Sequence, residues 1–209
     1  MKKTFGRLML LGSVLALSAC LNNGGTAPAI TSSTYSLPMN TRVMMSMSAR
    51  DQERLLTIDI GNYSREETKI PEGRMMEKSG LGVLRQIFQT VETNQPGMDP
   101  RLIAKIQGQG KYSTKDHVLK VGCSLDLYQA DGTLLGSFFA RSEQTNLLDY
   151  TQAVEPGYQI CLTKAANDML SSPALGRVQK AGFPAVNPAA FQSFIISLGL
   201  KPVPGSTKP

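Results

Sequence analysis

The order of apolar and polar residues predicts that the folded part of this chain opens with two strands. Apolar residues recur at every second position of residues 41–48 and 56–60, which is typical of strands with one buried face. The polar segment 49–54 between them fits a hairpin loop or a short helical turn. Residues 61–73 are polar and contain proline and glycine, so we expect a loop there.

A helix is predicted over residues 75–93. Apolar residues recur at spacings of three and four from Leu81 to Val91, which would place them on one face of a helix. Gly80 and Gly82 weaken the helix near its start, since glycine in a helix interior costs up to about 1 kcal/mol. The Gln-Pro-Gly sequence at residues 95–97 should end it.

The clearest pattern in the chain is a hairpin that follows a strand expected at residues 102–112. From Leu119 to Leu127 every odd residue is apolar and every even residue is small or polar. Asp131-Gly132 provides a two-residue turn. Pairing across this turn places Cys123 opposite Ala140 on the buried face of the sheet.

Two more helices are predicted towards the C-terminus, at residues 154–170 and 188–198, the second with Asn187 as its cap. The fold class is therefore α+β: an antiparallel sheet of about four or five strands, two helices packed on one face, and a short C-terminal helix. The expected division is a signal peptide (1–19), an anchor and flexible tether (20–38), an α+β domain (39–175), a C-terminal extension (176–200) and a disordered, proline-rich tail (201–209).

The N-terminus indicates where the protein resides. Lys2, Lys3 and Arg7 precede a short apolar run, the layout of a secretory signal, and the run is too short to cross a bilayer. The run ends in Leu-Ser-Ala-Cys at residues 17–20, which resembles the lipobox of bacterial lipoproteins. That resemblance implies cleavage between Ala19 and Cys20 and acylation of Cys20, including palmitate. The alternative is an ordinary cleaved signal with an incidental cysteine.

The residue after Cys20 is Leu21 rather than aspartate, which retains lipoproteins of enteric bacteria in the inner membrane. We therefore expect the periplasmic face of the outer membrane, or the cell-surface membrane in a Gram-positive source. The chain has 22 basic and 16 acidic residues, net +6; residues 1–19 hold three of the basic and none of the acidic ones, so the mature chain has 19 against 16, net +3. No dense basic run indicates nucleic-acid binding.

Cys123 and Cys161 remain as a pair once Cys20 is assigned to the anchor. Cys123 lies on the buried face of the predicted hairpin and Cys161 on the apolar face of the following helix, and these two faces meet if the helix packs on the sheet. The oxidising compartment outside the inner membrane permits a disulfide between them. Two buried free thiols are the alternative.

The sequence identifies no catalytic set, metal site or cofactor site. His117 is the only histidine, which excludes a site built from several histidines. If His117 acted as a general base beside Asp116, it would support a hydrolase. Such a pair is more often two solvated polar residues of a loop. The methionines at positions 44, 45 and 47 are either core residues or the lining of an apolar ligand groove.

The order of elements behind the lipobox, over residues 41–172, resembles two groups of small envelope lipoproteins. These are the uncharacterised YajG-type lipoproteins and the LptE-type lipopolysaccharide-assembly lipoproteins. The resemblance rests on element order, and the third helix and proline-rich tail depart from both groups, so no partner or binding residue carries over.

The functional hypothesis is a non-enzymatic, membrane-anchored accessory or structural subunit of an envelope assembly, with an envelope protein as partner. A lipid- or glycan-binding lipoprotein is the second hypothesis, and an envelope hydrolase using His117 is the third.

Overall fold

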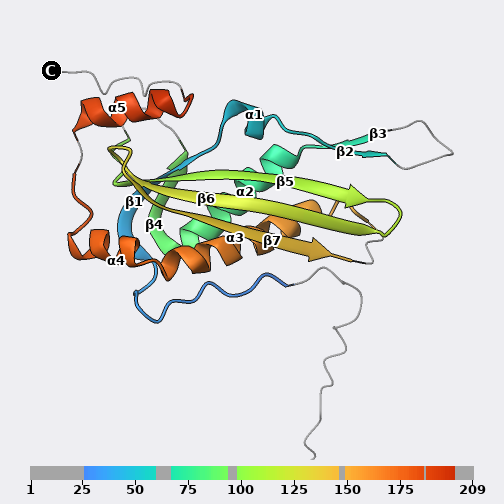
Figure 1. Ribbon diagram of the computed structural model, residues 1–209, viewed down its shortest axis with the longest axis horizontal. Helices are drawn as coiled ribbons and strands as arrows, with labels where there is room; N and C mark the ends of the chain where they lie inside the picture. Colours follow the sequence, from blue (N-terminus) through green and yellow to red (C-terminus); the bar gives the residue numbers. More distant parts are fainter. Residues whose placement is uncertain (1–25, 60–66, 94–97, 146–148, 186, 201–209) are drawn as a thin grey trace, which may run out of the picture.

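The computed structural model describes residues 26–59, 67–93, 98–145, 149–185 and 187–200. Its main sheet has five strands in the order β4-β1-β5-β6-β7, and a separate two-stranded sheet joins β2 to β3 (Figure 1). The strands are β1 (Met39–Ser46), β2 (Leu56–Asp59), β3 (Glu67–Ile70), β4 (Phe88–Thr93), β5 (Leu102–Ser113), β6 (Val118–Gln129) and β7 (Leu134–Gln144). The helices are α1 (Ala49–Gln52), α2 (Glu72–Ile87), α3 (Val154–Leu170), α4 (Pro173–Lys180) and α5 (Pro188–Ser197).

The predicted α+β class is confirmed, but the main sheet is mixed rather than antiparallel. β1 lies between β4 and β5 and runs parallel to both, whereas β5, β6 and β7 are antiparallel. Of the two alternatives for residues 49–54, the short helical turn is confirmed as α1, and the hairpin is wrong, because β2 leaves the main sheet and pairs with β3. β3 lies in the segment predicted to be a loop. The helix α2 then provides the crossover that returns the chain to β4, parallel to β1.

The predicted helix over residues 75–93 begins too late and ends too late. α2 begins at Glu72, and at Phe88 the chain turns directly into β4. Thr90, Val91 and Thr93 are β-branched and favour a strand, and β1 offers a partner for pairing. Gly80 lies inside α2, facing the sheet: a Cβ there would come within 2.5 Å of Cδ1 of Ile106. The glycine therefore permits close packing of α2 on the sheet.

The hairpin of β6 and β7 has the predicted register, with Cys123 opposite Ala140 and Leu125 opposite Phe138. α3 has the predicted bounds. α5 begins after Asn187, whose side-chain oxygen accepts a hydrogen bond from the Ala189 N–H at 2.8 Å. α4, which was not expected from the sequence, starts directly after α3 with Pro173 at its first position and Ser172 as its cap.

The hydrophobic core has two parts, one on each face of the main sheet. The larger part lies between the sheet and the two long helices, α2 and α3. The smaller part lies on the opposite face, where α5 covers only one end of the sheet (Figure 1). It contains Met44, Met98, Ile103, Ala130, Phe191 and Ile195. Two helices on one face and a short C-terminal helix are thus confirmed.

Residues 26–38, assigned to the flexible tether from sequence, lie against the domain. The Asn167 side chain on α3 donates to the Ala29 carbonyl at 3.1 Å and accepts from the Thr31 N–H at 3.2 Å. Tyr35 and Leu37 pack against the larger core. In this part of the chain a packed segment replaces the expected tether, because its few apolar residues find places on the core. The signal peptide, Cys20 and the tail 201–209 lie outside the described residues.

Candidate functional site

The candidate site lies on the part of the main sheet that α5 leaves open. The alternation that points odd residues of β6 and even residues of β7 towards α2 and α3 points their neighbours to this open face. A shallow groove of about 730 Å³ lies on it. It is lined by Asp51, Arg54, residues 107–109 of β5, residues 122–124 of β6 and residues 139–141 of β7.

Strand pairing arranges the groove floor in two rows across three strands. One row is Gln107, Ser124 and Phe139, and the next is Gln109, Gly122 and Arg141. The Phe139 side chain is 73% exposed. A single exposed apolar ring is common on protein surfaces, so it is its position in a shaped groove that makes Phe139 a candidate contact residue.

One wall of the groove is held in place by an arginine and an aspartate from the α1 region. The Arg54 guanidinium donates to the carbonyl oxygen of Gly108 and to the nearly buried carboxylate of Asp51. Asp51 also accepts a 2.7 Å hydrogen bond from the Ser48 hydroxyl, and Ser48 caps α1. The Asp51 carboxylate and the Arg54 guanidinium both have hydrogen-bond partners within the protein, so their role is to hold this wall in place.

The groove opens onto an edge of the main sheet. β7 pairs with β6 on one side, and no described strand pairs with its other side. Lys164 of α3 donates from Nζ to the carbonyl of Arg141 at 3.1 Å, satisfying one acceptor of this edge. Lysine at an unpaired edge is a common way of limiting uncontrolled strand addition.

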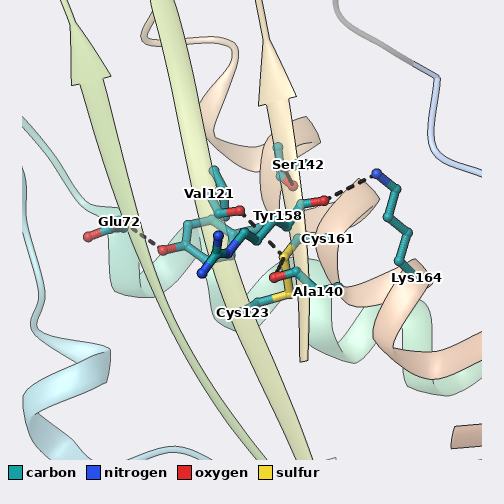
Figure 2. Close-up of a disulfide and its surroundings, with 10 residues drawn as sticks. Glu72, Val121, Cys123, Ala140, Ser142, Tyr158, Cys161 and Lys164 are labelled. Carbon is teal, nitrogen blue, oxygen red and sulfur yellow. Dashed lines mark hydrogen bonds between the residues drawn. A yellow bond between two sulfur atoms is a disulfide. The ribbon is translucent and has the colours of Figure 1, made fainter. Parts of the chain in front are cut away.

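The predicted disulfide lies directly beneath the groove. Cys123 of β6 and Cys161 of α3 are bonded, with their Cα atoms 6.1 Å apart (Figure 2). Both residues are buried. The Cys161 sulfur lies 3.3 Å from the carbonyl oxygen of Ala140, the small residue opposite Cys123. The bond therefore ties the floor of the groove to α3.

A second buried feature was not predicted from the sequence. Glu72, in the first turn of α2, accepts hydrogen bonds at Oε1 from the Tyr158 hydroxyl and the Gly110 N–H (Figure 2 shows the tyrosine contact). Burial, together with the Glu72 charge, raises the pKa of Tyr158 above its usual value. Pro71-Glu72 directly before an amphipathic segment is a helix-start signal that could have located this residue.

The structure does not bring the other residues proposed from sequence together in one place. His117 is an exposed residue of the β5–β6 turn with a positive φ of 52°, and its Nδ1 lies 3.4 Å from the Tyr112 hydroxyl. Its neighbour Asp116 accepts a hydrogen bond from Ser113. Met44, Met45 and Met47 are buried in the two cores, so they line no ligand groove. Within the described ranges no group of three or more metal-binding side chains gathers.

The described helices include none with the length and apolar character needed to cross a membrane. The lipidation residue Cys20 and the cleavage residue Ala19 lie outside the described residues, so their roles remain predictions.

The comparisons with known proteins show no family for this chain. No family model matches it, and no curated protein matches it. A solved DUF330 protein from Xanthomonas campestris is 11% identical to this chain, with a TM-score of 0.46. The match covers 74% of this chain and 98% of the Xanthomonas chain. A minor lipoprotein from Acinetobacter baumannii is 8% identical, with a TM-score of 0.28. The match covers 71% of this chain and 97% of the Acinetobacter chain. Neither is described as a YajG-type or LptE-type lipoprotein, and at these TM-scores neither likeness assigns this chain to a family.

Proposed function

We propose that this chain is a lipid-anchored, non-enzymatic lipoprotein of the cell envelope that binds a partner protein on the open sheet face. The observation that carries the binding role is Phe139, which is exposed and lines a shaped groove beside an unpaired sheet edge. The lipobox at residues 17–20 supports the anchor, and Leu21 in place of aspartate after Cys20 supports the outer-membrane location.

The charge of the open face indicates what kind of partner fits it. The two rows of the groove are flanked by the row Lys105, Asp126 and Ser137 and by the row Lys111, Lys120 and Glu143. Together with Arg141, the four rows carry four basic and two acidic side chains, so an acidic partner is favoured. An extended acidic segment of an envelope protein could pair with β7 while an apolar side chain of that segment packs on Phe139.

The binding role is tested by site-specific photocrosslinking in cells of the source organism. Replacement Phe139→p-benzoylphenylalanine puts a photoreactive group in the groove, and the same replacement of Arg85, exposed on α2, is the matched control. We expect an adduct with one envelope protein from position 139 and none from position 85. Equal labelling at both positions, or a chain without adducts that stays monomeric in membrane extracts, would overturn the proposal.

The anchor is tested separately with Cys20→Ala. We expect the variant to lose incorporation of labelled palmitate and to leave the outer-membrane fraction. Unchanged acylation would mean that Cys20 is not the lipidated residue, whatever the crosslinking experiment shows.

A further inference from the structure

A second groove lies at the other end of the main sheet, away from Phe139. It has a volume of about 690 Å³, and its lining residues come from β1, β4, the segment before β5 and the connection that leads from α4 to α5. Its lining consists of residues 40–42, Gln89, Thr90, Asp99, Arg101 and residues 182–185. None of these residues takes part in the function proposed above.

Strand register places two arginines side by side in this groove. Val43 pairs with Leu102 and Val91, and these three point into the core beneath α2 and α3. The preceding residues of β1 and β5, Arg42 and Arg101, therefore lie next to each other on the opposite face; the Arg101 N–H donates to the Arg42 carbonyl at 2.9 Å. Neighbouring strands are about 4.8 Å apart, so both guanidinium groups can reach one small ligand.

The two positive charges are only partly neutralised. Arg101 lies 3.5 Å from the carboxylate of Asp99, whose side chain is 65% exposed. An exposed ion pair of this length contributes little free energy and leaves most of the guanidinium donors free to bind. For Arg42, which is exposed, no ion pair is found in the described part of the chain.

Two threonines line the groove beside the arginines. Thr90 of β4 pairs with Arg42 and points to the same face. Thr41 lies in an irregularity of the β1–β4 register, and its buried Oγ1 has no hydrogen-bond partner among the described residues. A buried hydroxyl without a partner is costly, and an oxyanion seated at this wall would give it an acceptor.

The outer wall of the groove has a fixed shape. Gly182 and Phe183 close the C-terminus of α4, each with a positive φ, at 77° and 51°. Their N–H groups donate to the carbonyls of Gln179 at 2.9 Å and of Val178 at 3.1 Å, the pattern of a helix-ending Schellman turn. Phe183 also packs against the larger core, so the wall keeps its shape when no ligand is bound.

We propose that this groove binds a phosphate group, held by the guanidinium groups of Arg42 and Arg101 and by the hydroxyls of Thr41 and Thr90. Paired guanidinium donors match the oxygens of a phosphate in geometry as well as charge. The phosphate can belong to a lipid headgroup or to a soluble phosphate ester. The site does not depend on a lipid anchor or on the groove around Phe139.

The test uses the full chain in nonionic detergent and follows ligand binding by phosphorus NMR and by thermal stability. One arm uses inorganic phosphate, and the other uses dihexanoyl phosphatidylglycerol below its micelle concentration. Binding in the lipid arm alone identifies a headgroup as the source, and binding of inorganic phosphate identifies a soluble phosphate. Absence of binding in both arms overturns the proposal.

Variants connect the binding to these residues. Arg42→Gln and Arg101→Gln should each weaken binding about tenfold or more, while Arg85→Gln, the same charge change on α2, should leave it unchanged. Thr41→Val should weaken binding severalfold while raising the melting temperature of the ligand-free protein, because it removes an unpaired buried hydroxyl. Binding that is insensitive to both arginine variants, or equally sensitive to Arg85→Gln, overturns the proposal; full affinity in Thr41→Val removes that hydroxyl from the site.

Discussion

The Tyr158 hydroxyl on α3 donates a 2.6 Å hydrogen bond to the Glu72 carboxylate on α2, and both side chains are buried. These residues are 86 positions apart in sequence. The bond joins the two helices that cover the sheet, and the same carboxylate oxygen accepts from the Gly110 N–H of β5. A single carboxylate thus links both helices to the sheet.

Tyr158→Phe should destabilise the protein at neutral pH by about 1–3 kcal/mol, because Glu72 loses a hydrogen bond inside the core. The loss should shrink at alkaline pH. Burial raises the pKa of Tyr158 above its usual 10.0, so above about pH 10 the unfolded wild-type chain releases a proton that the native state retains, and wild-type stability falls as pH rises. Urea unfolding of both proteins between about pH 8 and pH 11 checks this; parallel pH curves would contradict it.

Gly108→Ala and Gly122→Ala should have opposite outcomes although both lie in the middle of the sheet. A Cβ at Gly108 would lie 2.6 Å from Cε1 of Tyr158 and 3.1 Å from the Gly122 carbonyl, whereas a Cβ at Gly122 would meet nothing within 4 Å. We expect a loss of about 1–3 kcal/mol for the first, and no change or a gain of up to about 1 kcal/mol for the second. Urea midpoints measure both, and equal midpoints would contradict the packing of α3 on β5.

Joint replacement of Cys123 and Cys161 by alanine should lower the free energy of unfolding by about 3–4 kcal/mol. The bond closes a loop with a sequence separation of 38, and its loss frees the unfolded chain. Chemical denaturation measures the change, and mass spectrometry after alkylation without reductant checks the bond itself. Alkylation of both thiols in unreduced, unfolded protein would show that the pair is not bonded.

Phe139→Ala should change stability by no more than about 0.5 kcal/mol, because the ring is 73% exposed. Leu125→Ala, on the neighbouring strand but fully buried, should cost about 2–5 kcal/mol. Thermal and urea unfolding compare the two variants. A large loss in Phe139→Ala would mean that the ring supports the fold, and it would weaken the case for a binding role.

The parts of the fold that the sequence predicted correctly are those whose signals are local. The turn at Asp131-Gly132 lies between two alternating segments, so the hairpin register follows from counting residues away from it. The pairing of Cys123 with Cys161 followed from the same register and the apolar face of α3.

The parts that were missed depend on distant segments. Phe88 and Val91 suit a helical face as well as a strand, and only the presence of β1 decides for the strand. Arg42 and Arg101 are neighbours because β1 pairs in parallel with β5, and no spacing in the sequence predicts that pairing. The exposure of Phe139 was hidden for a similar reason, since α5 covers only one end of that face.

The packed segment 26–38 limits how far the domain can stand from a membrane. If Cys20 carries the lipid, as proposed, only six steps of chain separate it from Thr26, a maximum span of about 20 Å. A free tether through Pro38 would span about 60 Å. With Ala29 and Thr31 held by Asn167, the domain would stay near the lipid headgroups, and any partner would have to meet it there rather than deeper in the periplasm.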